Sequence, residues 1–335
     1  MTGFARVLLT GGTGFAGGRL ARLLEPALPD AQLFAIAKDA ADGDATPALA
    51  NERWRVFDCD LRDGPALDRV VADCRPDLVL HLAAQSSVER GHAEAEATWA
   101  INHACTLSLA EAVARHAREA TFLFVSSAEV YGDTFRSSVA DETSATLPEG
   151  PYGEAKAAAE TDLRKIVPPS GQLIVARPFN HTGAGQQTDF VLPRIASQVA
   201  RIEQGDSAAV LQMGNVGASR DFLNVEDVCA AYLRLIGAAH RLARGGEAGA
   251  DNTFNIASGR SWRIMDLITM FRDRSTCRFR TQIDPAALRS GEIAEIRGSA
   301  EKLRKFCGWS PTIPIEQTIE ELLDYWRGVH CRETT

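Results

Sequence analysis

The feature that most constrains the fold is a glycine loop placed between a short apolar run and a helical pattern. Residues 6–10 (RVLLT) predict a buried strand, residues 11–17 (GGTGFAG) form the loop, and regularly spaced leucines follow. In a dinucleotide-binding loop, Gly11 allows the tight turn, Gly14 the approach of a pyrophosphate, and Gly17 close packing of the helix. The N-terminus of that helix then faces the phosphates. The spacing is G-x-x-G-x-x-G, and a plain strand-to-helix turn is the alternative.

Apolar runs alternate with helical segments through the first 180 residues. The predicted strands after the first are residues 33–37, 56–57, 78–82, 122–125 and 173–176. This alternation predicts an α/β fold, a Rossmann-type doubly wound parallel sheet with a smaller C-terminal substrate-binding lobe. We expect residues 1–180 to form the dinucleotide-binding domain, residues 222–257 to return to it, and residues 181–335 to form the substrate domain.

Composition excludes several classes of protein. The formal net charge is −8 and there is no basic block, which argues against general binding of nucleic acids. No apolar stretch approaches the ~20 residues of a membrane span, and the N-terminal apolar run is too short for a signal peptide. The seven cysteines contain no C-x-x-C pair and the seven histidines show no zinc-like spacing. We therefore expect reduced thiols, no metal site and a cytoplasmic location.

The residues that end the second, third and fourth strands bear on the choice of cofactor. An acid after the second strand would bind a ribose 2′-hydroxyl, but this chain has Lys38 there. A cation suits a 2′-phosphate better, which gives a weak preference for NADP(H) over NAD(H), and a solvated lysine is the alternative. Asp60, after the third strand, is placed to meet the adenine. Ala83 and Ala84 would let a cofactor lie close, whereas we interpret His81 as a hydrogen-bonded core histidine.

Two stretches carry a candidate proton relay. Ser127 follows the apolar run 122–125, so its hydroxyl would stand at the end of a strand, where it could orient a carbonyl. Tyr152 and Lys156 lie four residues apart in an alanine-rich segment that opens with Pro151, so they share a helix face. An ammonium beside a phenol favours the phenolate and lowers the tyrosine pKa. These groups suit the interconversion of an alcohol and a ketone. The alternative is that Tyr152 and Lys156 are surface residues of one helix without a catalytic role.

Five motifs together resemble the extended short-chain dehydrogenase/reductase family over essentially the whole chain. They are the glycine loop, HLAA at 81–84, SSAEVYG at 126–132, Tyr152 with Lys156, and RPFN at 177–180. The resemblance implies a nicotinamide cofactor, a catalytic set of Ser127, Glu129, Tyr152 and Lys156, and a homodimer through helices around 101–112 and 157–159. The cofactor-binding residues that it implies are Gly11, Gly14, Phe15, Gly17, Lys38, Asp60, Leu61, Leu82, Ala83, Ala84, Tyr152, Lys156 and Arg177.

Within that family the chain resembles most the enzymes that act on GDP-4-keto-6-deoxymannose. Residues 177–186 (RPFNHTGAGQ) are similar to the reductases' R-P-F-N-H-x-G-P-G-Q, with Ala184 in place of Pro. Two further departures are Gly150, where the family has Asn, and Ser290, where it has Pro. The resemblance implies that NAD(P)H reduces the C4 ketone of GDP-4-keto-6-deoxy-D-mannose to GDP-D-rhamnose or its C4 epimer. It places six residues around the GDP moiety: Asn180, Val191, Arg194, Arg220, Arg289 and Glu292.

Other activities stay open at this point. Glu129 stands where GDP-mannose 4,6-dehydratases have a glutamate that would remove a C5 proton, but the related reductases also carry an acid there. The Gly-Ala-Gly-Gln loop at 183–186 favours a reductase, because the dehydratases have a charged, arginine-containing loop there. A nucleotide-sugar epimerase and a heptose substrate are further alternatives. A non-enzymatic nucleotide-sensing scaffold is another, and the intact Ser/Tyr/Lys set argues against it.

Overall fold

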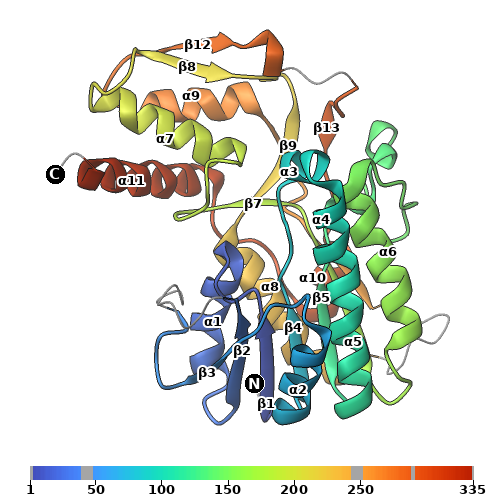
Figure 1. Cartoon of the computed structure of the whole chain (residues 1–335). Coiled ribbons are helices and arrows are strands. Elements are labelled where there is room, and N and C mark those ends of the chain that lie inside the picture. The colour runs from blue at the N-terminus through green and yellow to red at the C-terminus, as the bar shows by residue number, and fades with distance from the viewer. Residues whose placement is uncertain (1–2, 39–47, 243–251, 288–290, 334–335) are drawn as a thin grey trace.

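A seven-stranded parallel sheet forms the centre of the structure, a computed structural model that describes residues 3–38, 48–242, 252–287 and 291–333. The strands are β1 (Arg6–Thr10), β2 (Gln32–Ala37), β3 (Trp54–Asp58), β4 (Leu78–His81), β5 (Thr121–Val125), β6 (Gln172–Pro178) and β10 (Thr253–Ile256). Their order is β10-β6-β5-β4-β1-β2-β3, and every neighbouring pair is parallel (Figure 1). The chain therefore winds outward in both directions from β1, which confirms the predicted doubly wound, Rossmann-type sheet.

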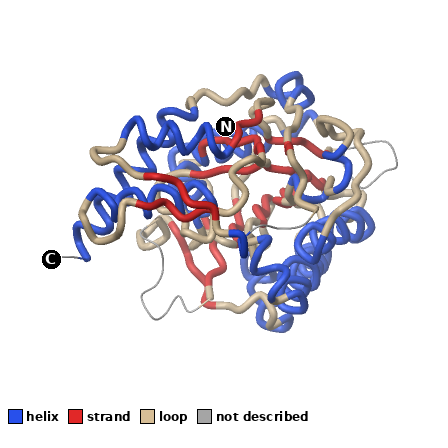
Figure 2. Tube along the Cα trace, turned by 90° about the horizontal axis from the view of Figure 1, so that it is seen from above, coloured by secondary structure: helices blue, strands red, loops and turns tan. Residues whose placement is uncertain are grey.

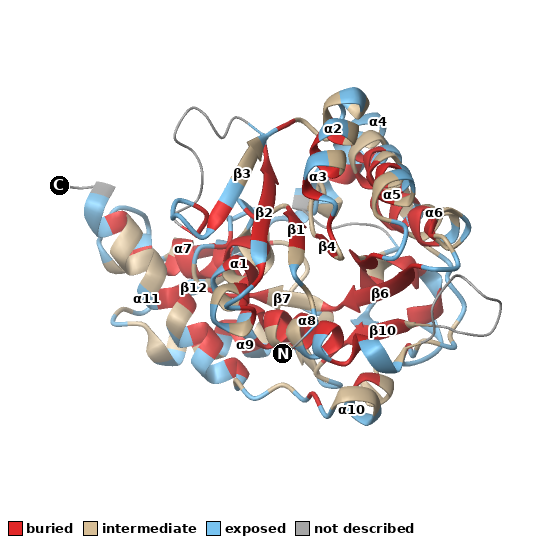
Figure 3. Ribbon diagram, turned by 90° about the horizontal axis from the view of Figure 1, so that it is seen from below, coloured by how far each residue is buried: buried red, intermediate tan, exposed pale blue. Residues whose placement is uncertain are grey.

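Helices cover both faces of this sheet, as Figure 3 shows. One face carries α1 (Phe15–Ala27), α8 (Val225–Gly237) and α10 (Glu301–Cys307). The other carries α2 (Gly64–Cys74), α5 (Cys105–His116) and α6 (Gly150–Ile166). Every residue of β4 and β6 is buried as a result, which explains why residues 78–80 and 173–176 within them are continuous apolar runs.

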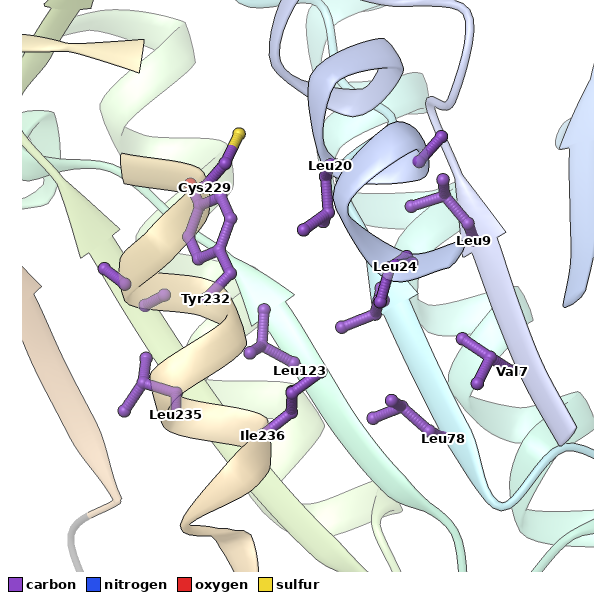
Figure 4. Packing of buried hydrophobic residues seen from close by; sticks show 14 of the residues in the cluster. Val7, Leu9, Leu20, Leu24, Leu78, Leu123, Cys229, Tyr232, Leu235 and Ile236 are labelled. Atoms are coloured by element: carbon purple, nitrogen blue, oxygen red, sulfur yellow. The ribbon is translucent and has the colours of Figure 1, made fainter. Parts of the chain in front are cut away.

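The core between α1, α8 and the sheet is visible in Figure 4. Leu20 and Leu24 lie four residues apart on α1 and are fully buried, and Val7 and Leu9 of β1 are also fully buried. Tyr232 of α8 is buried in the same cluster. This packing joins α8, from the second half of the chain, to the sheet built by the first half.

The opposite face bears on the predicted dimer contact. Leu109 and Ala112 of α5 and Ala159 of α6 are all buried in the core under the sheet. These three side chains face inward, so a partner subunit would have to contact other residues of these two helices.

The rest of the second half builds a smaller unit of its own. β9 (Ser219–Asn224) pairs with β7 (Asn180–Thr182), β11 (Ser261–Arg263) and β13 (Glu295–Ile296), and β8 (Val210–Met213) pairs with β12 (Arg280–Ile283). α7 (Val191–Glu203), α9 (Ile264–Arg274) and α11 (Ile315–Glu333) share one hydrophobic core with β8. The β8–β12 pair lies across these helices (Figure 2). The smaller C-terminal lobe of the predicted fold is thus present, while the exact domain boundaries stay a prediction.

Local sequence explains where several helices begin. Asn224 caps α8 as predicted, because its side chain accepts a hydrogen bond from the backbone N–H of Glu226. Asp63 caps α2 in the same way, and Pro151 stands in the first turn of α6. The short helices α3 (Val88–Ala93) and α4 (Ala95–Trp99) lead through a π turn at residues 100–104 into α5.

Neither a membrane span nor a metal cluster is found in the part of the chain that the structure describes. No helix there is both long and apolar enough to cross a membrane. No group of three or more His, Cys, Asp or Glu side chains there could hold a metal ion.

Candidate active site

The carboxyl ends of β1, β4, β5 and β6 open into a cavity of about 730 Å³. The starts of α1, α3 and α7, the first turns of α6 and the strand β7 also contribute to its wall. Doubly wound sheets bind their ligands at this edge. The predicted site residues that line the cavity are Gly11, Gly14, Phe15, Gly17, Lys38, Asp60, Leu61, Leu82, Ala83, Ala84, Ser127, Glu129, Tyr152, Lys156, Asn180 and Val191.

The glycine loop fits a dinucleotide. Gly11 has a φ of +74°, and a Cβ atom there would lie 2.6 Å from the backbone nitrogen of Ala83. A Cβ atom on Gly17 would collide with the carbonyl oxygen of Gly11. Among the described residues no side chain caps α1, so its first backbone N–H groups can bind phosphate oxygens. The loop therefore has the close approach and the uncapped helix end that a pyrophosphate requires.

Charged side chains gather where β2 and β3 end. Nε of Arg62 donates to the two carboxylate oxygens of Asp60 at 3.0 and 3.1 Å, and Nζ of Lys38 lies 3.8 Å from Asp60. The hydrogen bonds from Arg62 lower the pKa of Asp60 to about 2. Arg62 also lines the cavity. The sequence analysis missed Arg62, since a single basic residue in an irregular loop gives no periodic signal.

Ser127 and Tyr152 meet at the end of β5. Oγ of Ser127 accepts a hydrogen bond from the backbone N–H of Glu129 at 3.1 Å, and the side chain of Ser127 lies beside the hydroxyl of Tyr152. The pKa of Tyr152 is raised to about 12, mainly by burial; the neighbouring Ser127 opposes this shift and the charge of Glu129 adds to it. The expected lowering of this pKa by Lys156 was therefore wrong for this structure, because desolvation of the phenolate dominates. Tyr152 holds its proton firmly at neutral pH.

Lys156 lies one helical turn after Tyr152, with only 2% of its surface exposed. Its Nζ donates to the carbonyl oxygen of Val125 at 2.8 Å and lies 4.8 Å from the centroid of the Phe124 ring. Burial lowers the pKa of Lys156 to about 7, and the charge of Glu160 opposes this shift. Lys156 can therefore gain or lose its proton near neutral pH.

Glu129 adds a second group that can hold a proton in the cavity. Burial raises the pKa of its carboxyl, and the charge of Arg220 opposes this shift. Glu129 lines the cavity together with Tyr152. A protonatable carboxyl and a neutral phenol thus face the same space, which suits acid–base chemistry on a bound ligand.

The residues predicted to surround GDP are divided between the cavity wall and its surroundings. Asn180 and Val191 line the wall. Arg220 and Glu292 form an ion pair at 2.8 Å. Arg194 lies 3.5 Å from Glu89, a cavity-lining residue of α3. The structure thus brings Arg220 and Glu292 together and places Arg194 beside the cavity, whereas Arg289 lies outside the described residues.

Two other residues have their polar groups satisfied within the protein. Nε and Nη2 of Arg177 donate to the two carboxylate oxygens of Glu160 at 2.9 and 2.6 Å, and Arg177 is 5% exposed. The structure therefore turns Arg177 toward Glu160, although we expected it to contact the cofactor. Nδ1 and Nε2 of His81 are hydrogen-bonded to Thr10 and Thr106 at 2.7 and 2.8 Å. Burial lowers the pKa of His81 to about 3, in agreement with its interpretation as a core histidine.

The departures from the family pattern have local explanations. Gly150 has a φ of +77°, a conformation that Asn also tolerates, but a Cβ atom here would lie 2.5 Å from Cε1 of His92. Glycine therefore makes room for the His92 ring. The carbonyl of Ala184 accepts a hydrogen bond from Arg19, which leaves the loop anchored without the proline. Ser290 lies outside the described residues.

Comparisons with known proteins agree on one family. The family profile described as GDP-mannose 4,6 dehydratase matches residues 8–322. A GDP-6-deoxy-D-mannose reductase of Pseudomonas aeruginosa is 38% identical over 255 residues, which are 76% of this chain and 81% of the relative. A putative epimerase from Burkholderia cenocepacia J2315 has a TM-score of 0.83 at 33% identity, over 97% of this chain and 98% of its own. RMD from Pseudomonas aeruginosa, solved in complex with NADPH, has a TM-score of 0.77 at 30% identity, over 97% of this chain and 100% of its own.

Proposed function

Because the chain belongs to the GDP-mannose 4,6-dehydratase family of extended short-chain dehydrogenases/reductases, we propose that it reduces the C4 ketone of GDP-4-keto-6-deoxy-D-mannose with NAD(P)H. The product is a GDP-6-deoxyhexose, either GDP-D-rhamnose or its C4 epimer. The observation that carries the proposal is that one cavity joins the glycine loop to Ser127, Tyr152 and Lys156. Similarity to a GDP-6-deoxy-D-mannose reductase supports the choice of sugar.

The side chains of the cavity have distinct roles in this reduction. The bound nicotinamide supplies a hydride to C4. Ser127 donates a hydrogen bond to the ketone oxygen, and Tyr152 transfers its proton to that oxygen as negative charge develops there. The raised pKa of Tyr152 keeps the phenol protonated until then, and an alkoxide is basic enough to remove the proton. Protonated Lys156 stabilises the tyrosinate that results and binds the nicotinamide ribose.

The cofactor contacts follow from the glycine loop and the strand ends. Gly11, Gly14 and Gly17 receive the pyrophosphate, and Asp60 meets the adenine. Lys38 and Arg62 both contact Asp60, so two cations lie near the end of β2. Two cations there would bind a 2′-phosphate, which favours NADPH over NADH. The remaining proposed contacts are Phe15, Leu61, Leu82, Ala83 and Ala84, which line the cavity.

The GDP moiety lies toward the second half of the chain. Arg220 binds the diphosphate and Glu292 accepts hydrogen bonds from a ribose diol or a guanine edge, once the ligand has replaced part of their mutual ion pair. Asn180 and Val191 contact the ligand from the cavity wall. Arg194 and Arg289 complete the proposed set.

A 4,6-dehydratase is the second candidate, and Glu129 favours it. A dehydratase needs a base for the C5 proton, and Glu129 faces the cavity beside Tyr152 with a raised pKa. That reaction takes a hydride from C4 and returns it to C6, so it regenerates its own cofactor. A reductase instead consumes a reduced nicotinamide in every turnover.

This difference in hydride balance provides the test. Purified protein is given NADPH or NADH with either GDP-mannose or GDP-4-keto-6-deoxymannose prepared chemoenzymatically, and the products are identified by NMR. We expect stoichiometric loss of the reduced nicotinamide with the ketone and no conversion of GDP-mannose. A 4-keto product formed from GDP-mannose, without net change in nicotinamide absorbance, would identify a dehydratase with Glu129 as the C5 base.

Assembly and location complete the proposal. We expect a cytoplasmic homodimer that contacts its partner through α5 and α6, at positions other than the buried Leu109, Ala112 and Ala159. Trp99, just before the π turn that leads into α5, is 36% exposed. Light scattering at micromolar concentration tests this, since a monomeric mass would contradict it.

A further inference from the structure

A buried carboxylate lies directly behind the proton relay. Glu160 is on α6, four residues after Lys156 and eight after Tyr152, so the three side chains follow one helix face. The side chain of Glu160 is 3% exposed. Burying a carboxylate is unfavourable unless charged and hydrogen-bonded partners compensate. The hydrogen-bond partners of Glu160 therefore indicate the role of this buried carboxylate.

Glu160 holds the end of β5. Oγ of Ser126 donates to Oε1 of Glu160 at 2.6 Å. Ser126 stands between Val125, whose carbonyl accepts the hydrogen bond from Lys156, and Ser127, whose hydroxyl faces Tyr152. A shift of Ser126 would therefore move the anchor of Lys156 and the hydroxyl of Ser127 together.

On its other side Glu160 is fixed by Arg177. The two side chains form a bidentate pair, and Nη1 of Arg177 donates to the hydroxyl of Tyr131 at 2.9 Å. That hydroxyl donates to Oδ1 of Asn255 at 2.7 Å. The network thus connects α6 to β6 and to the edge strand β10, so Glu160 is anchored to two strands of the sheet and can in turn anchor Ser126.

The charges around Lys156 give Glu160 a second effect. On α6, Lys156 has the neutral phenol of Tyr152 on one side and Glu160 on the other. β4 presents His81, which is neutral near pH 7, and β5 presents the ring of Phe124 and the Val125 carbonyl. Glu160 supplies the opposing negative charge that partly offsets the cost of burying the ammonium.

We propose that Glu160 is a positioning residue of the active site, which fixes the end of β5 through Ser126 and keeps Lys156 protonated through its negative charge. This inference rests on the proposed function, in which Lys156 must be protonated to stabilise the tyrosinate. It assigns Arg177 a role behind Glu160, as the cation that binds the carboxylate through two hydrogen bonds, beside Arg164, whose Nη2 lies 3.7 Å from Oε2 of Glu160.

The pH profile of kcat/KM tests the electrostatic part. Glu160→Gln keeps the shape of the side chain, removes its charge and leaves the charge of Arg177 without its carboxylate, and both changes disfavour the ammonium form of Lys156. The basic limb of the profile, where Lys156 loses its proton, should therefore move to lower pH by about 1 unit, as expected for the loss of a nearby opposite charge. Glu160→Asp keeps the negative charge, so the basic limb of this variant should lie between those of Glu160→Gln and the wild type.

Ser126→Ala tests the positioning part by itself. It leaves the charge of Glu160 in place and releases the end of β5. We expect kcat to fall on the order of 10-fold, since misplaced groups transfer protons poorly, while the basic limb stays where it is. An unchanged kcat in this variant would contradict the role given to the hydrogen bond.

The chain offers a matched control in the second half. Arg327 pairs with Glu203 through bonds of 2.7 and 2.8 Å, and the Glu203 side chain is 7% exposed. Glu203→Gln removes a comparable charge far from the cavity, so it should lower Tm and leave the basic limb unmoved. If Glu160→Gln does not fold, Glu160→Gln with Arg177→Met removes both charges, and a downward shift of the limb is still expected.

A second readout separates this inference from the proposed function. NADPH binding can be followed by NADPH fluorescence and needs no sugar. Because Lys156 binds the nicotinamide ribose, the affinity for NADPH should fall at the same basic pH as kcat/KM, and Glu160→Gln should move this fall to lower pH. Protein that binds NADPH with this limb but reduces no GDP-4-keto sugar would refute the function and keep the inference. Glu160→Gln could instead lower Tm and leave the basic limb at the wild-type pH, both for kcat/KM and for NADPH binding. The Glu160–Arg177 pair would then be purely structural, and the inference would be overturned.

Discussion

The two walls of the cavity are built in different ways. On the sheet side, Lys156, Glu160 and Arg177 are between 2% and 5% exposed, and Glu160 and Arg177 are paired with each other. On the side of the second half, water reaches the charged pairs. The side chains of Arg194 and Glu89 are 46% and 61% exposed.

This difference separates chemistry from recognition. The buried groups of the sheet side have fixed positions and shifted pKa values before any ligand arrives, which is what proton transfer requires. Exposed ion pairs such as Arg194–Glu89 are each worth about 0–1 kcal/mol, so an anionic ligand can replace the carboxylate at little cost. Arg220 and Glu292, whose side chains are 14% and 26% exposed, lie between these extremes.

The strongest challenge to this comparison is Tyr152→Phe. It removes the proton donor of the sheet side and keeps the ring, so turnover should fall by about 10²–10⁴, the usual contribution of a general acid, with NADPH binding little changed. Tyr325→Phe, on α11 in the other lobe, is the matched control and should be active. Turnover of Tyr152→Phe within a few-fold of wild type would remove Tyr152 from the mechanism.

A pair of glycines tests how tightly the sheet side is built. Gly11 and Gly205 both have positive φ, +74° and +79°, but in the described part of the chain a Cβ atom meets nothing within 4 Å at Gly205 and is 2.6 Å from Ala83 at Gly11. Gly205→Ala should cost about 1 kcal/mol of stability from backbone strain alone. Gly11→Ala adds overpacking, so roughly 2–4 kcal/mol is expected, together with a loss of NADPH binding. Denaturant unfolding measures the loss of stability and titration with NADPH measures the loss of binding. Equal losses of stability in Gly11→Ala and Gly205→Ala would argue against a preorganised loop.

The recognition side is tested by GDP binding to Arg220→Met and Arg194→Met. If Arg220 binds the diphosphate, its loss should weaken GDP on the order of 10-fold, the value of a charge-assisted hydrogen bond of about 1.5 kcal/mol. Arg194 is more exposed and should matter less. Titration calorimetry gives both values, and an Arg220→Met protein that binds GDP as well as wild type would leave the Arg220–Glu292 pair without a role in recognition.

The smallest expected effect concerns Lys38. Its side chain is 57% exposed, so its contact with a 2′-phosphate is worth less than about 1 kcal/mol. Lys38→Ala should therefore reduce the preference for NADPH over NADH by less than about 5-fold. Wild-type protein that prefers NADH would show that Lys38 is merely solvated.

The sequence was informative where local patterns decide the structure. β1 ends at the predicted residue because a buried parallel strand is a continuous apolar run, and α8 begins at the predicted cap because Asn224 satisfies its first free N–H group. β12 escaped prediction because its mostly exposed residues show neither alternation nor an apolar run. Short, open pairs of strands depend on tertiary contacts that a local pattern does not contain.

The site shows the same division. Spacing placed Tyr152 and Lys156 on one helix face, but it could not show that burial, and not the neighbouring charge, controls the tyrosine pKa. Desolvation depends on everything packed around a group. Arg177 was assigned to the cofactor from a motif, and its bidentate pair with Glu160 joins residues 17 positions apart on different elements. Neither fact is visible before the chain is folded.

The central claim is that this cavity reduces a ketone at C4 of the sugar. The most direct measurement uses NADPH that carries deuterium at the transferable position, with GDP-4-keto-6-deoxymannose as substrate and NMR of the product. The account predicts deuterium at C4 and an equal loss of NADPH. Deuterium at C6, or a converted sugar without loss of NADPH, would contradict it.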